Sequence, residues 1–356
     1  MELDNIVAPL LGWYRENARD LPWRRNVTPY RVWISEIMLQ QTRVEAVKGY
    51  FERFVSAVPE IPALAELPEQ RLLKLWEGLG YYSRAKNLQR AAQVCVQRYG
   101  GRLPEDYQTL LSLPGVGPYT AGAVASIAFG LPVPAVDGNV LRVWSRLTAE
   151  DGDIADGRVK ARAAEALAAV MPAGESGAFN QSLMELGATV CLPNAAPLCE
   201  KCPVKTLCEA HIAGKETQYP HKHTKPPRRV AERTLFLLER EGRLAIDRRP
   251  AKGLLASLWE LPGADGTLTM DESVQAVRAL GLEPLRLVPL APYKHIFTHV
   301  EWHVSGWHVK LSPDGENKTL VWADPAELGG TYPLPSAFRP YLNTFLALSE
   351  MGNLKL

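Results

Sequence analysis

The chain has 356 residues, of which 46% are hydrophobic and 22% charged, with a net charge of +1. It is long enough for two or three domains, and its balanced charge provides no global attraction to nucleic acid. No apolar run approaches the ~18 residues of a membrane span, and the acidic start MELDN lacks the cationic region of a secretory signal. We therefore expect no membrane association and a cytoplasmic location.

Helical patterns fill the first two thirds of the chain. Thr28 and Pro29 form a helix start, and Thr42 to Glu45 has the spacing of a capping box. Further helices are expected at 69–78, 83–99, 106–112, 119–129, 138–148, 157–171 and 175–190, with Gly or Pro at the breaks. Residues 209–230 mix Lys, His and Pro with few apolar residues, so we interpret them as a linker.

A tight turn at 114–118, with sequence PGVGP, lies between two of these helices. Gly115 and Gly117 lack a Cβ atom, so backbone N–H groups there can approach an anion, and the following helix N-terminus favours negative charge. Taken alone, the turn is compatible with an ordinary helix–helix connection. A phosphate group is the ligand that this geometry would fit.

The pattern changes in the last third of the chain. Residues 234–239 and 243–247 flank a turn and predict a hairpin. A helix near 271–280, strands near 294–311 and 318–323, and a terminal helix near 336–348 complete a separate α+β domain. Read as one strand, residues 294–304 would place His295, Phe297, His299 and His303 on a single face. A half-exposed strand explains this pattern better than a histidine metal site.

Four cysteines fall within 18 residues of a long chain: Cys191, Cys199, Cys202 and Cys208. Four thiolates so close can hold one tetrahedral zinc ion or a [4Fe–4S] cluster. A zinc ribbon has two C-x2-C knuckles and this stretch has one, so the spacing favours the cluster and a reducing compartment. Cys95 stands alone on a helix and is expected in the core.

Two carboxylates stand out in the helical part. Glu36 lies mid-helix in the apolar run VWISEIML, where it is either a solvent-facing residue or a buried acid with a raised pKa. Asp137 precedes the helix at 138–148 and has the position of a simple N-cap. Cleavage of an N-glycosidic bond needs one protonated acid for the leaving base and one ionised acid facing the cationic sugar.

The motifs WISEIMLQQT, LGYYSRAKNL, LPGVGPYTAGA and VDGNV, with the four-cysteine loop, resemble the helix-hairpin-helix DNA glycosylases, and most closely the adenine DNA glycosylases of the MutY family. The resemblance covers essentially the whole chain. It implies a helical glycosylase domain at 1–208, with the helix-hairpin-helix at about 106–129 and a [4Fe–4S] cluster loop at 191–208. A linker at 209–230 and a Nudix-like α+β domain at 231–356 would follow.

The resemblance also implies residue roles. Glu36 would protonate adenine, Asp137 would stabilise the oxocarbenium-like sugar or its covalent adduct, and Asn139 would support Asp137. Tyr119 replaces the Schiff-base lysine of bifunctional relatives, which predicts base removal without strong strand cleavage. By the same resemblance, the adenine pocket would contain Arg19, Trp23 and Gln181. Gln41 and Tyr81 would wedge into the duplex. The loop that reads 8-oxoguanine would contain Phe297, Thr298 and His299.

Three departures from the family pattern are visible. The first cysteine spacing is seven residues where the family usually has six, which a loop tolerates. The run 274–281 lacks the glutamates of a Nudix catalytic box, so pyrophosphohydrolase activity is not expected. Threonine at 298 replaces the family's serine and keeps its hydroxyl. If this resemblance holds, residues 297–299 lie in a loop or at a strand end.

The predicted function is therefore that of a monofunctional glycosylase that removes adenine opposite 8-oxoguanine or guanine in duplex DNA. We expect a monomer associated with the nucleoid. A bifunctional glycosylase/AP lyase of the endonuclease III type is the alternative, and Tyr119 and the appended domain oppose it. A DNA-binding protein without activity is a third possibility, which the presence of both Glu36 and Asp137 opposes.

Overall fold

A computed structural model describes residues 2–193, 195–223 and 227–353. The described residues form two compact units. The first contains those within Met1–Leu67 and Ser83–Lys225, and the second those within Pro68–Tyr82 and Pro226–Leu356. The first is all-α and the second mainly a sheet with helices, so the predicted multidomain fold class is confirmed. None of the described helices is long and apolar enough to cross a bilayer.

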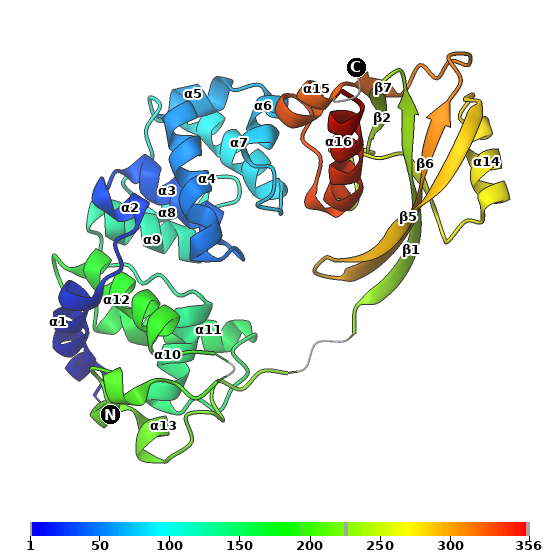
Figure 1. Ribbon diagram of the computed structural model, residues 1–356. Coiled ribbons are helices and arrows are strands. Elements are labelled where there is room, and N and C mark those ends of the chain that lie inside the picture. Colours follow the sequence, from blue (N-terminus) through cyan, green and yellow to red (C-terminus); the bar gives the residue numbers. More distant parts are fainter. Residues whose placement is uncertain (1, 194, 224–226, 354–356) are drawn as a thin grey trace. The chain divides into compact units, whose positions relative to one another are not determined.

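The first unit is built from helices joined by short turns (Figure 1). Its elements are η1 (Leu3–Ile6), α1 (Val7–Asn17), α2 (Pro22–Arg25), α3 (Pro29–Leu39), α4 (Val44–Ala57), α5 (Ile61–Glu66), α7 (Ser83–Arg98), α8 (Tyr107–Leu111), α9 (Pro118–Phe129), α10 (Gly138–Thr148), α11 (Gly157–Ala169), α12 (Ser176–Thr189), η2 (Cys199–Lys201), η3 (Lys205–Leu207) and α13 (Glu209–Ile212). The predicted helices in this unit are all present. Four of the α-helices described in this unit, α1, α2, α5 and α13, are not predicted by the sequence analysis.

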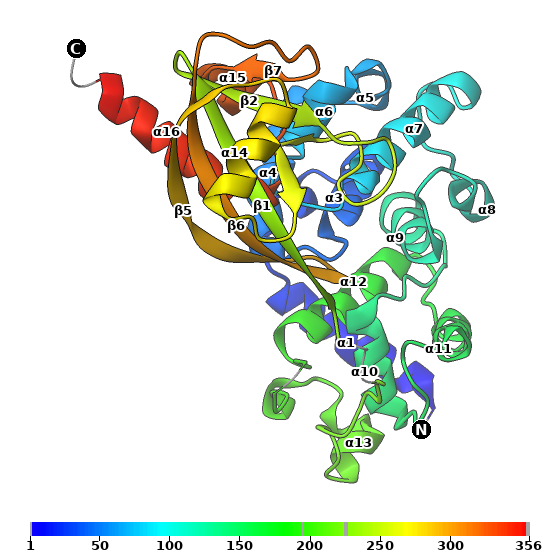
Figure 2. The same cartoon turned by 90° about the vertical axis from the view of Figure 1, so that its right-hand side faces the viewer.

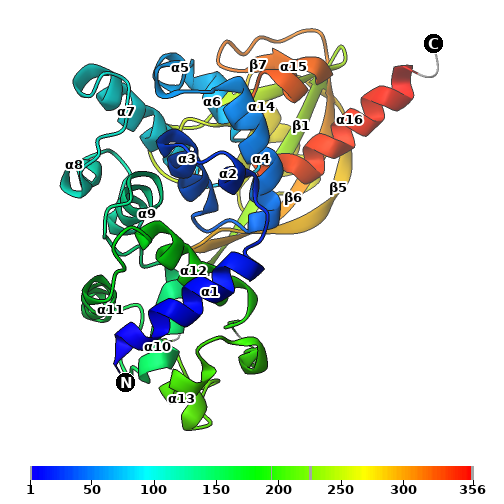
Figure 3. The same cartoon turned by 90° about the vertical axis from the view of Figure 1, so that its left-hand side faces the viewer.

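Side-chain caps begin several of these helices. Thr28 accepts a hydrogen bond from the Arg31 N–H at the start of α3, and Asp137 accepts one from Val140 at the start of α10. The predicted capping box at Thr42 is wrong, because Arg43 occupies the N-cap position of α4 and makes no side-chain cap bond. Helix α12 contacts α1, α9 and α10, and Figure 3 shows α1 lying along it. Phe179 and Leu183 of α12 are buried in this core.

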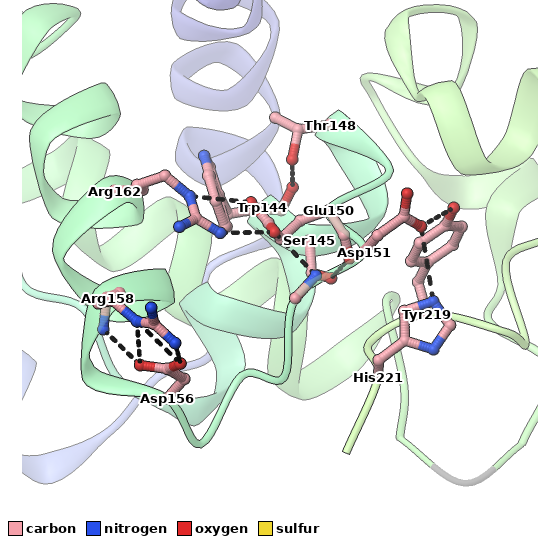
Figure 4. Close-up of polar contacts among 11 residues, drawn as sticks. Trp144, Ser145, Thr148, Glu150, Asp151, Asp156, Arg158, Arg162, Tyr219 and His221 are labelled. Atoms are coloured by element: carbon pink, nitrogen blue, oxygen red, sulfur yellow. Dashed lines mark hydrogen bonds and ion pairs between the residues drawn. The ribbon is translucent and has the colours of Figure 1, made fainter. Parts of the chain in front are cut away.

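The expected linker is in part ordered. Residues 209–212 form α13, and the chain that follows returns to the helical unit, where the Tyr219 hydroxyl donates to Asp151 at 3.0 Å (Figure 4). His221 lies 3.7 Å from the same carboxylate, and its carbonyl accepts from the Ile154 N–H. The sequence does not predict this ordered packing, because polar side chains and backbone atoms make the contacts and no apolar pattern marks them. Residues 224–226 lie outside the described part.

The second unit includes a segment from the middle of the helical sequence. Helix α6 (Glu69–Leu75) and the turn up to Tyr82 contact the C-terminal residues and belong to the second unit. Residues 68–82 thus pack with the second unit, although the sequence analysis placed them in the helical domain at 1–208, whose bounds stay a prediction. The sequence does not reveal this packing, because the side chains that make it, Lys74 and Glu77, look like ordinary charged surface residues.

A seven-stranded sheet forms the body of the second unit. Its strands are β1 (Arg229–Arg240), β2 (Arg243–Arg248), β3 (Trp259–Glu260), β4 (Gly263–Asp265), β5 (Pro284–Ile296), β6 (Val300–Leu311) and β7 (Val321–Ala323). The main order is β3-β2-β1-β6-β5, with β4 paired to β1 and β7 to β2. The β1–β6 pair is parallel and the other pairs are antiparallel. The predicted hairpin is the β1–β2 pair, with Glu239 opposite Leu244.

Helices cover both faces of this sheet (Figures 1 and 2). Helix α14 (Met270–Ala279) lies on one face, where Phe236 and Leu238 of β1 pack with Val277. Helix α16 (Arg339–Asn353) lies on the other, where Leu235 and Leu237 join Phe345. The alternation along β1 produces these two cores, as expected for a strand buried on both faces. Helix α15 (Pro325–Gly330) and η4 (Ser336–Phe338) complete the unit.

Candidate active site

Glu36 is a buried acid. It lies on α3 among buried neighbours, and only 6% of its surface is exposed, so the solvent-facing alternative is wrong. Burial raises the pKa of Glu36 from 4.5 to about 7, with a further upward contribution from Asp137 and opposing ones from Tyr119 and Arg24. At neutral pH a large fraction of this side chain therefore carries a proton.

Tyr119 contacts this acid directly. Its side chain comes from the first turn of α9, and its hydroxyl donates to Glu36 Oε2 and lies 3.8 Å from the Met184 sulfur. Burial, with the nearby charges of Glu36 and Asp137, raises the pKa of Tyr119 well above its ordinary value of 10. The phenol therefore stays protonated and remains a hydrogen-bond donor.

Asp137 is both a helix cap and a member of the pocket. Oδ1 accepts from the Val140 N–H at 2.7 Å, and Oδ2 accepts from Asn139 Nδ2 at 2.8 Å. Burial raises the pKa of Asp137, while these hydrogen bonds and the charge of Arg142 oppose the rise. The Arg142 guanidinium also donates to Asn139 Oδ1 at 2.9 Å and to the Cys191 carbonyl at 2.8 Å. The structure thus confirms Asp137 as the N-cap of α10 and places its side chain in the same cavity as Glu36, while its catalytic role stays a prediction.

The two acids line one cavity of about 560 Å³, which we call the acid pocket. A cavity of this size accommodates a small organic molecule. Several predicted site residues line the acid pocket together, namely Arg19, Trp23, Glu36, Gln41, Gly117, Tyr119, Asp137, Asn139 and Gln181. Three elements far apart in the sequence, α3, α9 and α12, meet there.

A buried carboxylate that the sequence did not reveal also lines the acid pocket. Glu185 on α12 is 1% exposed and pairs with Arg19 at 2.6 Å and Arg24 at 2.9 Å. Although burial opposes it, hydrogen bonds from the two arginines lower the pKa of Glu185, so this acid is ionised. Glu185 follows Gln181 by four residues, which places both on one helix face and was the available signal. The Tyr14 hydroxyl donates to Gln181 Oε1 at 3.0 Å.

The hairpin turn before α9 needs glycine at one of its two positions. Gly115 has φ +76°, and a Cβ there would lie 2.6 Å from the Asn87 Cβ. Gly117 is the N-cap of α9 with φ −96° and open space around it, so folding does not demand glycine there. The absence of a Cβ leaves its N–H accessible at the helix N-terminus.

The four cysteines lie beside the core formed by α10 and α12. Cys191, Cys202 and Cys208 pack against it, Cys191 Sγ accepts a hydrogen bond from Arg146 Nη1 at 3.2 Å, and Cys199 Sγ lies 3.9 Å from Glu216. Among the described residues, the group of possible metal ligands whose ligand atoms all lie within 4.8 Å of one another is Cys199, His211 and Glu216, which includes one of the four cysteines. A single zinc ion would need its sulfurs roughly 3.8 Å apart.

Residues 297–299 form the turn between β5 and β6. The continuous strand considered for 294–304 is therefore wrong, and the loop position holds. Phe297 packs on Trp302 with ring centroids 4.9 Å apart, and its N–H donates to the Val300 carbonyl. The Thr298 hydroxyl lies 2.9 Å from the Tyr81 hydroxyl in the same unit. Tyr81 and residues 297–299 thus come together in the second unit, while the other predicted residues lie in the first.

The arrangement of helices around the turn between α8 and α9, with Glu36 and Asp137 in one cavity, can be compared with known families. Residues 34–169 match the HhH-GPD superfamily of base excision DNA repair proteins, and residues 233–344 match the NUDIX domain family. The solved structure of a non-covalent endonuclease III–DNA complex is similar with a TM-score of 0.51 and 25% identity, over 59% of this chain and 95% of that one. The helical part of the chain at 34–169 is therefore similar to base excision DNA repair proteins.

Comparison with whole chains identifies the family. The chain is 35% identical to the adenine DNA glycosylase of Homo sapiens, over 84% of this chain and 66% of the relative. It is 34% identical to that of Rattus norvegicus, over 89% of this chain and 71% of the relative. The chain belongs to the adenine DNA glycosylase family, whose enzymes are N-glycosylases, a class of hydrolase.

Proposed function

We propose that this enzyme removes adenine opposite 8-oxoguanine or guanine in duplex DNA by hydrolysis of the N-glycosidic bond, without strand cleavage. The observation that supports this most strongly is the placement of Glu36 and Asp137 in one cavity with different surroundings. A glycosylase needs such a pair, since one acid protonates the leaving base and the other faces the sugar cation.

Glu36 supplies the proton. Its pKa of about 7 leaves it both protonated and acidic enough to donate at neutral pH, which is the condition for efficient general acid catalysis. Once adenine leaves, positive charge develops on the sugar, and the Asp137 carboxylate stabilises it by charge or by a covalent bond at the anomeric carbon. Asn139 fixes the orientation of Asp137 through the bond to Oδ2.

Tyr119 accounts for the absence of lyase chemistry. Strand cleavage of the endonuclease III type starts with a lysine amine that forms a Schiff base with the sugar. A phenol has no such chemistry, and this one is engaged with Glu36. Tyr119 therefore orients the acid and leaves the abasic site intact.

The adenine would lie between the two acids and the α12 face of the acid pocket. Trp23 contributes a buried aromatic wall, and the Gln181 side-chain carbonyl offers a hydrogen-bond acceptor to an exocyclic amino group. Glu185 does not offer one, because its two oxygens already accept four hydrogen bonds from Arg19 and Arg24. Arg19 acts through Glu185, which it holds in place at 2.6 Å. These groups favour a base that carries an amino substituent.

Recognition of the damaged partner base is assigned to the second unit. Phe297, Thr298 and His299 form a turn whose hydroxyl and imidazole can hydrogen-bond to a base edge. Tyr81 would insert its ring into the duplex, as would the amide of Gln41, to fill the space left by the extruded adenosine. The N–H groups at Gly115 and Gly117 would bind a backbone phosphate.

The four cysteines would hold a [4Fe–4S] cluster. The spacing of the four cysteines, with one C-x2-C knuckle where a zinc ribbon has two, supports the cluster, and Arg146 Nη1 donates a hydrogen bond to Cys191 Sγ at 3.2 Å. When bound, the cluster would fix the 191–208 loop against the helical core. A brown protein with about four irons per chain supports this assignment, and a colourless protein with stoichiometric zinc contradicts it.

The decisive assay uses three duplexes with adenine opposite 8-oxoguanine, guanine or thymine. Base loss is measured after alkali, which cleaves abasic sites, and strand cleavage is measured without it. We expect efficient base loss opposite 8-oxoguanine, less opposite guanine, little opposite thymine, and no cleavage before alkali. Equal removal from all three duplexes, or cleavage without alkali, would contradict the proposal. We also propose that the enzyme acts as a monomer on cytoplasmic, nucleoid DNA.

A further inference from the structure

Polar contacts join the segment Pro68–Tyr82 to the C-terminal part of the second unit. Lys74 Nζ donates to the Leu328 carbonyl at 3.0 Å and the Tyr332 carbonyl at 3.2 Å, and pairs with Glu77 at 2.7 Å. Glu77 Oε1 accepts from the Leu334 N–H at 3.1 Å. Lys74 and Glu77, which we call the docking pair, are 16% and 14% exposed, so solvent screens them little.

The docking pair binds where backbone groups need partners. Helix α15 ends at Gly330, and Leu328 is in its last turn. Carbonyl groups at a helix C-terminus lack partners within the helix and carry partial negative charge, which a lysine ammonium satisfies. Gln70 adds a bond from its side-chain amide to the Thr331 carbonyl at 3.1 Å. The contacts thus bind α6 to a short stretch, 328–334.

Tyr81 lies near the C-terminal end of the segment Pro68–Tyr82. The turn after α6 contains Gly78 and Gly80 at φ +101° and +70°, and Tyr81 itself has φ +47°, a conformation that a bulky residue adopts only when its surroundings enforce it. The Trp76 indole N–H donates to the Gly80 carbonyl at 3.2 Å. The Tyr81 side chain is exposed, and its hydroxyl lies 2.9 Å from that of Thr298.

We infer that Lys74 and Glu77 are positioning residues that hold the Tyr81 turn against the Thr298 loop, so that the inserted ring and the base-reading hydroxyl act as one rigid body. This inference rests on the proposed function. It assigns to the docking pair a role in selectivity for 8-oxoguanine, although neither residue touches DNA. The Tyr81–Thr298 contact is the link through which they act.

The test compares single-turnover rates on adenine opposite 8-oxoguanine and opposite guanine for wild type, Lys74→Met, Tyr81→Phe and the double variant. We expect Lys74→Met to lower the 8-oxoguanine rate about tenfold, since it removes charged hydrogen bonds, and to change the guanine rate much less. Because Lys74 acts through the Tyr81 hydroxyl, adding Lys74→Met to Tyr81→Phe should cost little more. Lys74→Arg, which keeps the donors, should restore the rate.

Two further measurements separate positioning from simple stability. A 2-aminopurine next to 8-oxoguanine reports ring insertion by its fluorescence, which Lys74→Met should diminish at saturating protein. Arg278→Met removes a half-exposed ion pair to Glu283 in the same unit and should leave rates and fluorescence unchanged. If Lys74→Met does not fold, Glu77→Gln, which keeps an acceptor for Leu334, should show the same loss of selectivity more weakly.

The outcomes are distinguishable. Wild-type protein without preference for 8-oxoguanine would overturn the proposed function. A preference that survives in Lys74→Met, an equal loss on both substrates, or additive losses in the double variant would overturn only the role of the docking pair.

Discussion

Replacing Glu36 by glutamine tests the chemical centre of the enzyme. Glutamine has the same shape and can still accept the Tyr119 hydrogen bond, but it cannot give up a proton to adenine. Duplex binding should therefore survive while base removal is lost. General acids contribute roughly 10²- to 10⁴-fold, and we expect a loss in that range.

The size of the effect follows from burial. With its ordinary pKa of 4.5, Glu36 would be roughly 0.3% protonated at pH 7, whereas with a pKa of about 7 it is roughly half protonated. The environment thus raises the concentration of the active acid by about two orders of magnitude. Wild-type rates should fall about tenfold per pH unit above pH 7, because the proton is lost there.

The same burial costs stability. Since the pKa of Glu36 is raised on folding, the native state holds more protons than the unfolded state between pH 4.5 and about 7. Stability therefore falls as pH rises through that window, and the deficit is complete above it. Glu36→Gln removes the deficit and should stabilise the protein by about 3 kcal/mol at pH 8, with little gain at pH 4.

The assays are single-turnover base release from pH 5 to 9, duplex affinity by fluorescence anisotropy, and urea unfolding at pH 4 and 8. Wild-type rates that stay flat from pH 6 to 9, or a Glu36→Gln variant with full activity, would refute the acid role. A variant that is less stable than wild type at pH 8 would show that Glu36 is charged and paired in the native state.

Three other predictions follow from the site and its supports. Borohydride should trap little wild-type enzyme on DNA and more of Tyr119→Lys; strong wild-type trapping would contradict monofunctional chemistry. Gly115→Ala should destabilise the helical unit by at least about 1–2 kcal/mol, because φ is +76° and the new Cβ meets Asn87, whereas Gly117→Ala should unfold at the wild-type temperature; equal effects would refute this. Cys202→Ala should lose iron and visible absorbance, and full iron content in this variant would exclude Cys202 as a ligand.

Local signals in the sequence were sufficient for most of the helical unit. The Thr28–Pro29 start and the glycine and proline breaks act within a few residues, so the element boundaries could be predicted. The β1–β2 hairpin was found for the same reason. The continuous strand over 294–304 was wrong because the alternation continues across the turn at 297–299, whereas the family resemblance placed these residues correctly in a loop or at a strand end.

Tertiary contacts decided the rest. Glu36 lies among residues that are buried on all sides of α3, so no periodicity could separate an exposed acid from a buried one. Glu185 was overlooked since its arginine partners lie more than 160 positions away in the sequence. The docking pair resembles a surface ion pair at i, i+3 spacing, and its backbone partners follow only from the fold.

The hydrogen bond from Tyr119 gives the Glu36 carboxyl a direction. One of its two oxygens is already occupied by the phenol proton, so the transferable proton resides on the other, Oε1. A carboxylic acid free in solution can donate its proton to a base that approaches from any direction, whereas the Glu36 carboxyl can donate only from Oε1. Under the proposed mechanism, a nucleobase would receive the proton only when it approaches Oε1, so the orientation of this acid would itself limit which bases are released.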